Sequence, residues 1–154
     1  MTIIDRKLID QALEIVKPGI EKLLTVPGMT WGPEHVDVCI LTISGKDINR
    51  FASTFGKKVK WNPDWGKVDT QMLADEKAVI SAREQANTSS ICSSVPWLFE
   101  ENEHLYGGGI YYANISIGVS GATEIVDQHI AEMILSQIIL LARMEAEVRK
   151  KSQV

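Results

Sequence analysis

The residues best suited to bind a ligand follow one another between positions 106 and 127. A segment rich in β-branched residues leads through Gly118-Val119-Ser120-Gly121 into an apolar helical pattern that starts near Thr123. The first backbone N–H groups of a helix have no partner inside the helix, and with the helix dipole they attract anions. Ser120 and Thr123 add hydroxyl groups, and Gly121 lets a ligand approach the backbone closely. The alternative is that one of these hydroxyls simply caps the helix.

Three titratable side chains, Lys77, His104 and Asp127, are candidates for acid–base chemistry. His104 lies in a polar stretch before a triple glycine and is the best candidate for an axial metal ligand, with a solvated loop histidine as the alternative. Glu100 and Glu103 form an E-x-x-E pair. Their carboxylates suit a hard cation or iron, although most acidic stretches are only solvated surface.

Two further groups of residues could contact a ligand. Gly107, Gly108 and Gly109 precede a strand, whereas the glycines of a dinucleotide-binding motif follow a strand and begin a helix, so that motif is excluded. The three glycines indicate either a close ligand or a glycine-rich turn. Trp61 and Trp65 lie four residues apart in an irregular segment, where they could stack on a flat ligand or pack the loop onto the protein.

A serine hydrolase is a poor interpretation of the same segment. The nucleophile elbow G-x-S-x-G would place Ser120 as the nucleophile, but Ala122 stands where the second glycine belongs. No histidine follows in the order that the catalytic triad would need.

Apolar periodicity predicts the elements that position these residues. Helices are expected over 4–24, with Thr2 as N-cap and a kink or break at Pro18, over 69–87, and from 123 to beyond 148. Strands at 35–43 and 48–53 form a hairpin, and two more between 110 and 120 turn at Ala113-Asn114. Residues 54–68 are expected as a loop and 97–99 as a short apolar plug, and the segment 88–96 between the second helix and the plug is polar and ends in Pro96. The last helix is apolar on more than one side, which suggests a subunit interface.

Composition restricts the class of protein. The 154 residues fit one domain, 1–154, and the net charge of -4, without a basic patch, argues against nucleic acid. No signal peptide and no run of about 18 apolar residues is visible, so we expect a cytoplasmic protein with no membrane partner. Two cysteines do not make a disulfide framework.

The series Gly107-Gly108-Gly109-Ile110, Gly118-Val119-Ser120-Gly121 and Asp127 resembles the signature of the GlcG/HbpS family, which includes the C-terminal domain of PduO-type cobalamin adenosyltransferases. Lys77-Ala78 stands where that family has Lys-Ala. The chain departs from the family at Ser44, where Asp is usual, and after the glycines, where Pro is usual. The hairpin around Asn114 is shorter, and the tryptophan segment looks like an insertion.

The resemblance implies an α/β (α+β) fold that is profilin-like, with an antiparallel sheet of about five strands flanked by helices and assembled as a homo-oligomer. It implies a protein that binds a small molecule, with haem as one candidate cofactor. Lys77 would pair with a ligand carboxylate beside Gly107–Gly109 and Ser120–Gly121. Two alternatives remain open: a small lyase- or isomerase-type enzyme acting on a small metabolite, with aromatic compounds among the candidates, and a purely structural oligomer subunit.

Overall fold

A computed structural model describes residues 2–58, 62–66 and 69–153 of the chain. Four helices and four strands follow in the order α1, β1, β2, α2, α3, β3, β4, α4, with short 3₁₀ turns η1 and η2 on either side of α2 and α3. Their bounds are α1 Arg6–Leu24, β1 His35–Ser44, β2 Asp47–Gly56, η1 Pro63–Trp65, α2 Thr70–Glu84, α3 Thr88–Ser94, η2 Pro96–Leu98, β3 Gly109–Tyr112, β4 Ile115–Ser120 and α4 Glu124–Ser152.

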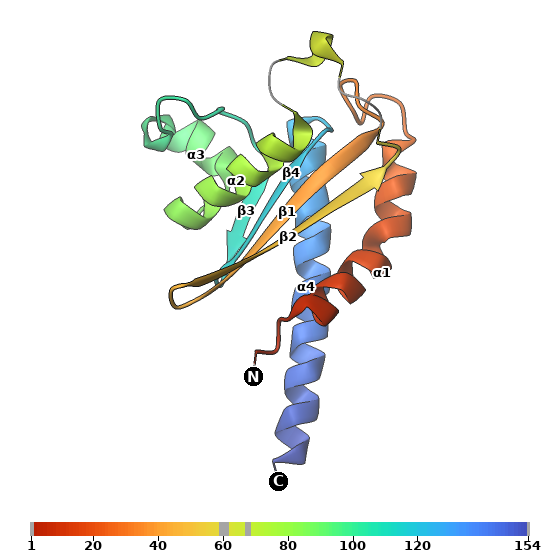
Figure 1. The fold of residues 1–154 in the computed structure, drawn as a ribbon, viewed down its shortest axis with the longest axis vertical. Helices are drawn as coiled ribbons and strands as arrows, with labels where there is room; N and C mark the ends of the chain where they lie inside the picture. The colour runs from red at the N-terminus through yellow and green to blue at the C-terminus, as the bar shows by residue number, and fades with distance from the viewer. Residues whose placement is uncertain (1, 59–61, 67–68, 154) are drawn as a thin grey trace.

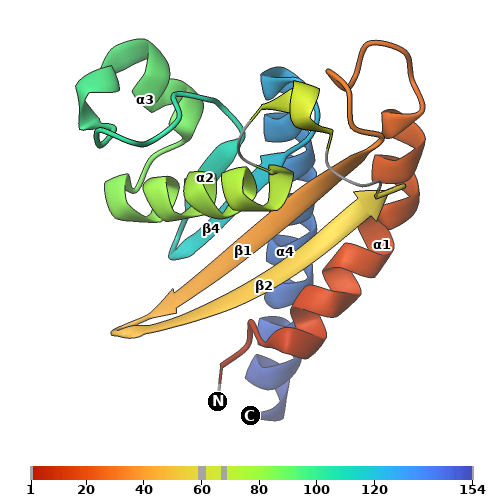
Figure 2. The ribbon, with the colours of Figure 1, turned by 45° about the horizontal axis from the view of Figure 1, so that its top comes forward.

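The strands form one antiparallel sheet in the order β2-β1-β4-β3. Helices α1 and α4 cover one face of this sheet, and α2 crosses the other face with α3 beside it (Figures 1 and 2). The expected class, α+β with an antiparallel sheet flanked by helices, is therefore confirmed. The expected number of strands was wrong: the described residues form four strands rather than about five.

Both predicted hairpins are present because their turns contain residues that tolerate the required backbone. Gly45 has φ +61° between β1 and β2, and Ala113 and Asn114 have φ +45° and +67° between β3 and β4. Positive φ at the first central residue alone, as at Gly45, and at both central residues, as at Ala113 and Asn114, are the two geometries that match the twist of a two-residue hairpin. The second turn places β4 against β1 and directs its end, at Ser120, toward the start of α4.

Strand β1 is central because both of its faces are apolar, as expected. Val36, Val38 and Ile40 are fully buried in the main core, which α1 and α4 complete from one side. Cys39 and Leu41 point to the other face and contact Ala74 and Ala78 of α2 in a smaller core cluster. The small residues on α2 let this helix lie close to the sheet, which determines where Lys77 is placed.

The helix ends differ in detail from the predictions. Asp5, not Thr2, is the N-cap of α1, since its carboxylate accepts a hydrogen bond from the N–H of Leu8 at 2.9 Å. The helix also continues through Pro18 without a break. The polar segment at 88–96, for which no element was predicted, contains the short helix α3, and Trp97, expected in an apolar plug, is 74% exposed.

Helix α4 is the one helix in the described part of the chain that is long and apolar enough to cross a bilayer. Its first half is a core helix here, because Ile130, Ile134 and Ile138 are fully buried against the sheet and α1. Its second half extends beyond the end of the sheet (Figure 1).

Candidate functional site

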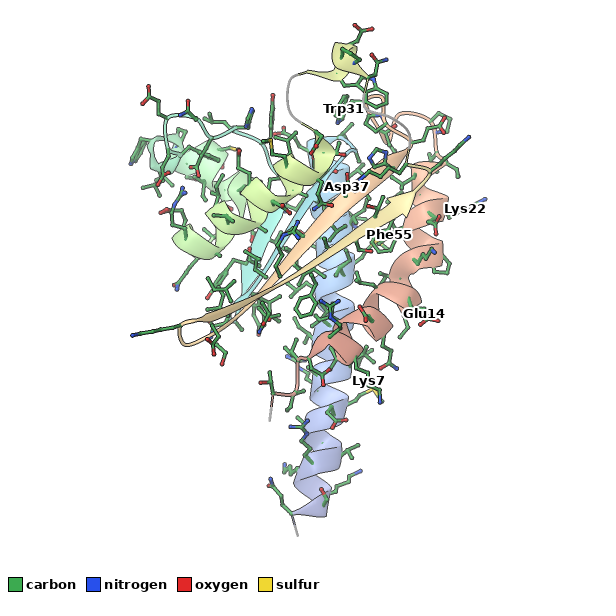
Figure 3. All side chains as sticks on the ribbon, viewed as in Figure 1. Lys7, Glu14, Lys22, Trp31, Asp37 and Phe55 are labelled. Carbon is green, nitrogen blue, oxygen red and sulfur yellow. The ribbon has the colours of Figure 1, made fainter. Side chains whose placement is uncertain are left out.

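A pocket of about 550 Å³ opens where the start of α4 meets α2 and the segments before β1 and β3. Its volume lies within the usual range for small-molecule sites. The residues that line it come from widely separated parts of the sequence: Trp31, Trp65, Gly66, Leu73, Lys77, His104, Tyr106, Ser120, Ala122, Thr123, Glu124 and Asp127. Figure 3 shows Trp31 at this end of the molecule, near η1 and the start of α2.

A buried ion pair lies at the inner wall of the pocket. The ammonium of Lys77 donates hydrogen bonds to the carbonyl oxygen of Val119 at 2.8 Å and to Oδ2 of Asp127 at 3.1 Å. Both side chains are at most 5% exposed. The other carboxylate oxygen of Asp127 accepts a hydrogen bond from the N–H of Ala122 at 2.9 Å. The pair thus joins α2, the end of β4 and the first turn of α4.

Burial shifts the pKa of Asp127 strongly. Removing the carboxylate from water raises its pKa, while the charge of Lys77 and the N–H of Ala122 oppose that effect, and the balance places the pKa at about 6. An ordinary aspartate has a pKa near 4. Asp127 can therefore gain or lose a proton near neutral pH, which an acid–base residue must do.

The glycines make room for this arrangement. A Cβ at Gly108, where φ is +112°, would lie 2.9 Å from Nζ of Lys77 and 2.9 Å from Cβ of Asp127. A Cβ at Gly118 would overlap the carbonyl oxygen of Ala74, and one at Gly109 would lie 2.6 Å from the carbonyl oxygen of Lys77. The glycines therefore allow α2 to lie directly on β3 and β4. Gly108, Gly109 and Gly118 themselves do not line the pocket.

The first turn of α4 uses neither predicted hydroxyl as a cap. Thr123 is the N-cap residue, but its side chain makes no capping hydrogen bond. Ser120 is 3% exposed and lines the pocket, and its hydroxyl has no hydrogen-bond partner among the described residues. Ser120 and Thr123 thus offer the pocket two hydroxyl groups beside a helix start.

Aromatic side chains surround the outer part of the pocket. Trp31 and Trp65 meet edge to face with ring centroids 6.1 Å apart, and the rings of His104 and Tyr106 stack at 6.2 Å. Nδ1 of His104 lies 3.1 Å from Oε1 of Glu76, which also accepts the backbone N–H of His104. Trp65 was predicted to contact a ligand and does line the pocket, whereas Trp61 lies outside the described residues.

A second buried polar network holds the start of α2 against β1. Asp37, labelled in Figure 3, is 1% exposed and accepts hydrogen bonds from the hydroxyls of Thr54 at 2.6 Å and Thr70 at 2.5 Å. Burial alone would raise the pKa of Asp37, but these hydrogen bonds and the charge of Lys58 outweigh it and lower the pKa. His35 completes the network, with Nε2 at 3.0 Å from Oγ1 of Thr70. Because Thr70 begins α2, the network positions Lys77 two turns later.

The two glutamates predicted as metal ligands lie away from the pocket lining. Both carboxylate oxygens of Glu103 accept hydrogen bonds from Arg83, at 2.7 and 2.9 Å, and Glu100 lies 3.7 Å from the same guanidinium. Arg83 lowers the pKa of Glu103. No group of three or more His, Cys, Asp or Glu side chains within the described ranges could hold a metal ion. The geometry thus gives the metal prediction no support.

Sequence reasoning singled out the residues that the inner wall brings together, Lys77, Ser120, Thr123 and Asp127, but missed part of the outer wall. Trp31 and Tyr106 carried no periodic or motif signal, since both lie in irregular segments. Asp37 had a usable signal, because a charged residue in an otherwise apolar central strand needs buried partners.

No protein-family model, curated protein or solved structure matches the chain.

Proposed function

We propose that the protein binds a small planar anion in the pocket at the start of α4, in the manner expected of a GlcG/HbpS-type ligand-binding protein of the cytoplasm. The observation that carries the proposal is the meeting of an ammonium, two hydroxyls and a helix start at one hollow. Each of these groups favours negative charge, and together they surround a space large enough for a small molecule. The two carboxylates of the lining oppose an anion but already have partners: Asp127 pairs with Lys77, and Glu124 accepts the N–H of Gly107.

The anionic end of the ligand belongs at the inner wall. An ammonium has three N–H donors, and those of Lys77 have two partners, Val119 and Asp127. A ligand carboxylate could accept the third and also bind the hydroxyls of Ser120 and Thr123. Such charge-assisted hydrogen bonds are stronger than neutral ones, so they would fix the orientation of the ligand.

The flat part of the ligand belongs at the outer wall, between Trp31, Trp65 and Tyr106. Indole and phenol rings offer large rigid surfaces for an aromatic ring, and Leu73 adds an apolar contact. Haem is one candidate, because the hydrogen bond between Nδ1 of His104 and Glu76 is the arrangement that orients histidines for metal ligation through Nε2. Bound haem would supply an iron centre, and His104 would be its ligand.

Thermal unfolding with added ligand tests the proposal, since a ligand at one hundred times its Kd stabilises the folded state by about 2.7 kcal/mol. Haemin and a series of one- and two-ring aromatic carboxylates should be compared on three proteins: wild type, Leu73→Trp, which places an indole in the ligand space of the pocket, and Met72→Trp as a matched control. Met72 precedes Leu73 on α2 but does not line the pocket. Stabilisation of wild type and Met72→Trp, but not of Leu73→Trp, is expected.

An equal effect on all three proteins, or no effect from any compound, would contradict the proposal. The haem version has its own criterion. If stoichiometric haemin produces no Soret shift, or if His104→Ala leaves the shift unchanged, haem is not the ligand held by His104.

The pKa of Asp127 favours a second candidate, an enzyme that transfers protons on the same kind of molecule. Asp127, with a pKa of about 6, would exchange a proton with the substrate, while Lys77 and the α4 start would stabilise negative charge that develops on it. A pH–rate profile measured on wild type, Asp127→Asn and Lys77→Ala tests this. Full activity in both variants would exclude it.

A further inference from the structure

The second half of α4 extends from the rest of the molecule with an apolar side exposed. Ile138 is the last buried residue of α4, and the 14 residues that follow it in the helix, 139–152, span about 20 Å at 1.5 Å per residue. The C-terminal half of α4 continues past the end of the sheet (Figure 1). Leu140, Met144 and Val148 recur every four residues there and are 52%, 59% and 62% exposed. Residues four apart share one side of a helix, so these three form a continuous apolar stripe, called the α4 stripe below.

A groove of about 510 Å³ lies between this half of α4 and the start of α1, and its lining combines apolar residues with Asp5, Lys7, Gln11, Glu145 and Arg149. Ile3 and Leu8 line one side of the groove, and Leu141, Met144 and Val148 line the other. Contiguous apolar surface on an otherwise polar exterior usually marks an interface. The α4 stripe and the groove therefore need a partner that covers them.

We propose that the partner is a second copy of this chain, with the two α4 stripes packed antiparallel around a two-fold axis at Met144. In a two-fold interface the same surface is used twice, and a residue on the axis meets its own counterpart. Centred on Met144, Leu140 of one copy faces Val148 of the second copy, and the reverse. Each apolar residue of the stripe thus faces an apolar residue of the second copy.

Charges beside the stripe favour the same alignment. Arg143 and Glu147 lie on one flank of the stripe, and Arg143 has no ion-pair partner in the part of the chain that the structure describes. In an antiparallel pair centred on Met144, Arg143 of each copy lies beside Glu147 of the second copy. Two such opposite-charge pairs form in each dimer, and complementary charges fix the alignment of an interface.

A lipid bilayer is a less suitable partner for this surface. A membrane-spanning helix needs about 20 mainly apolar residues, but α4 carries Arg143, Glu145, Glu147, Arg149, Lys150 and Lys151 in its exposed half. Its apolar first half is occupied by the core. The interface proposed here does not depend on the ligand pocket, which lies at the opposite end of α4.

Cysteine cross-linking tests the two-fold axis directly. In a Cys92→Ser background, which leaves only the buried Cys39, Met144→Cys should form a disulfide-linked dimer under mild oxidation. Met72→Cys is the matched control, because Met72 is also a methionine, is 54% exposed and lies on α2, on the other face of the sheet. Thiols facing each other in a dimer have a high effective concentration, so we expect at least about ten-fold faster cross-linking of Met144→Cys.

Light scattering gives the independent measurement. Wild type and Met72→Lys should have about twice the 17.1 kDa mass of one chain, whereas Met144→Lys, with unchanged circular dichroism, should have the mass of one chain. The proposal is overturned if wild type has the mass of one chain, if Met144→Lys remains dimeric, or if the two cysteine variants cross-link equally. Flotation of wild type with anionic vesicles, lost in Met144→Lys, would overturn it in favour of a membrane.

Discussion

Replacing Asp127 by asparagine should remove a pH dependence of folding stability that the buried carboxyl creates. The pKa of Asp127 rises from an ordinary value of 3.8 to about 6 in the folded protein, mainly because burial disfavours the charged form. The difference of about two pKa units corresponds to about 3 kcal/mol, at 1.36 kcal/mol per unit. Only the wild type contains this group, so comparison with the variant isolates it.

The sign follows from proton binding. Between pH 3.8 and about 6 the folded chain keeps the proton of Asp127 that the unfolded chain has already lost. The stabilisation is therefore complete below the lower value and is lost as the pH rises through the upper one. Asp37 acts in the opposite direction, because its pKa is lowered in the folded protein, but it is present in both proteins and cancels in the difference.

Urea unfolding of wild type and Asp127→Asn, at one protein concentration, gives the free energy of unfolding at each pH. The advantage of wild type over the variant should decrease by about 3 kcal/mol between about pH 4 and pH 7, and should then stay constant. A difference that does not change with pH would refute the reasoning. It would mean that Asp127 titrates normally and that the carboxyl is not buried beside Lys77.

Two further predictions concern the surroundings of this pair. Lys77→Met should cost about 3–5 kcal/mol of unfolding free energy, since it leaves the Asp127 carboxylate buried without its partner. The double variant Lys77→Met/Asp127→Leu should recover most of this loss. Chemical denaturation in which the losses of the two single variants simply add in the double variant would contradict this. Gly118→Ala should destabilise the protein by about 1–3 kcal/mol or more, because its Cβ overlaps the backbone of Ala74. Gly19 lies inside α1, and a Cβ there would have its nearest neighbour at 3.5 Å, so Gly19→Ala should instead raise the melting temperature. Equal effects of the two glycine substitutions would contradict the close packing of α2 on Gly118.

Periodicity was sufficient to predict most of the fold. The three long helices and both hairpins could be located because their apolar residues recur at helical or alternating spacing. Helix α3 was missed because its seven residues, TSSICSS, are mostly polar and too few to show a period. The N-cap of α1 was misplaced because Thr2 and Asp5 are both suitable capping residues, and only the structure distinguishes them.

The inner wall of the site was more predictable than the outer wall for a physical reason. A strand that ends in Val119-Ser120-Gly121 leads directly into an apolar helical pattern, so local sequence alone predicts the helix start and places Asp127 in the first turn. The contact of Trp31 with Trp65 depends instead on how two irregular segments meet. Gly107–Gly109 were interpreted as signs of either a close ligand or a turn, yet the backbone that approaches Gly109 belongs to Lys77 on α2, a contact between distant positions that spacing does not reveal.

Native mass spectrometry of the freshly purified protein tests the central claim, the binding of a small molecule beside Lys77, most directly. Wild type and Met72→Trp should carry the same additional mass of a small organic acid or haem, and that mass should be absent from Leu73→Trp, whose indole occupies part of the ligand space. An additional mass that persists in Leu73→Trp, or bare polypeptide in all three proteins, would contradict the account.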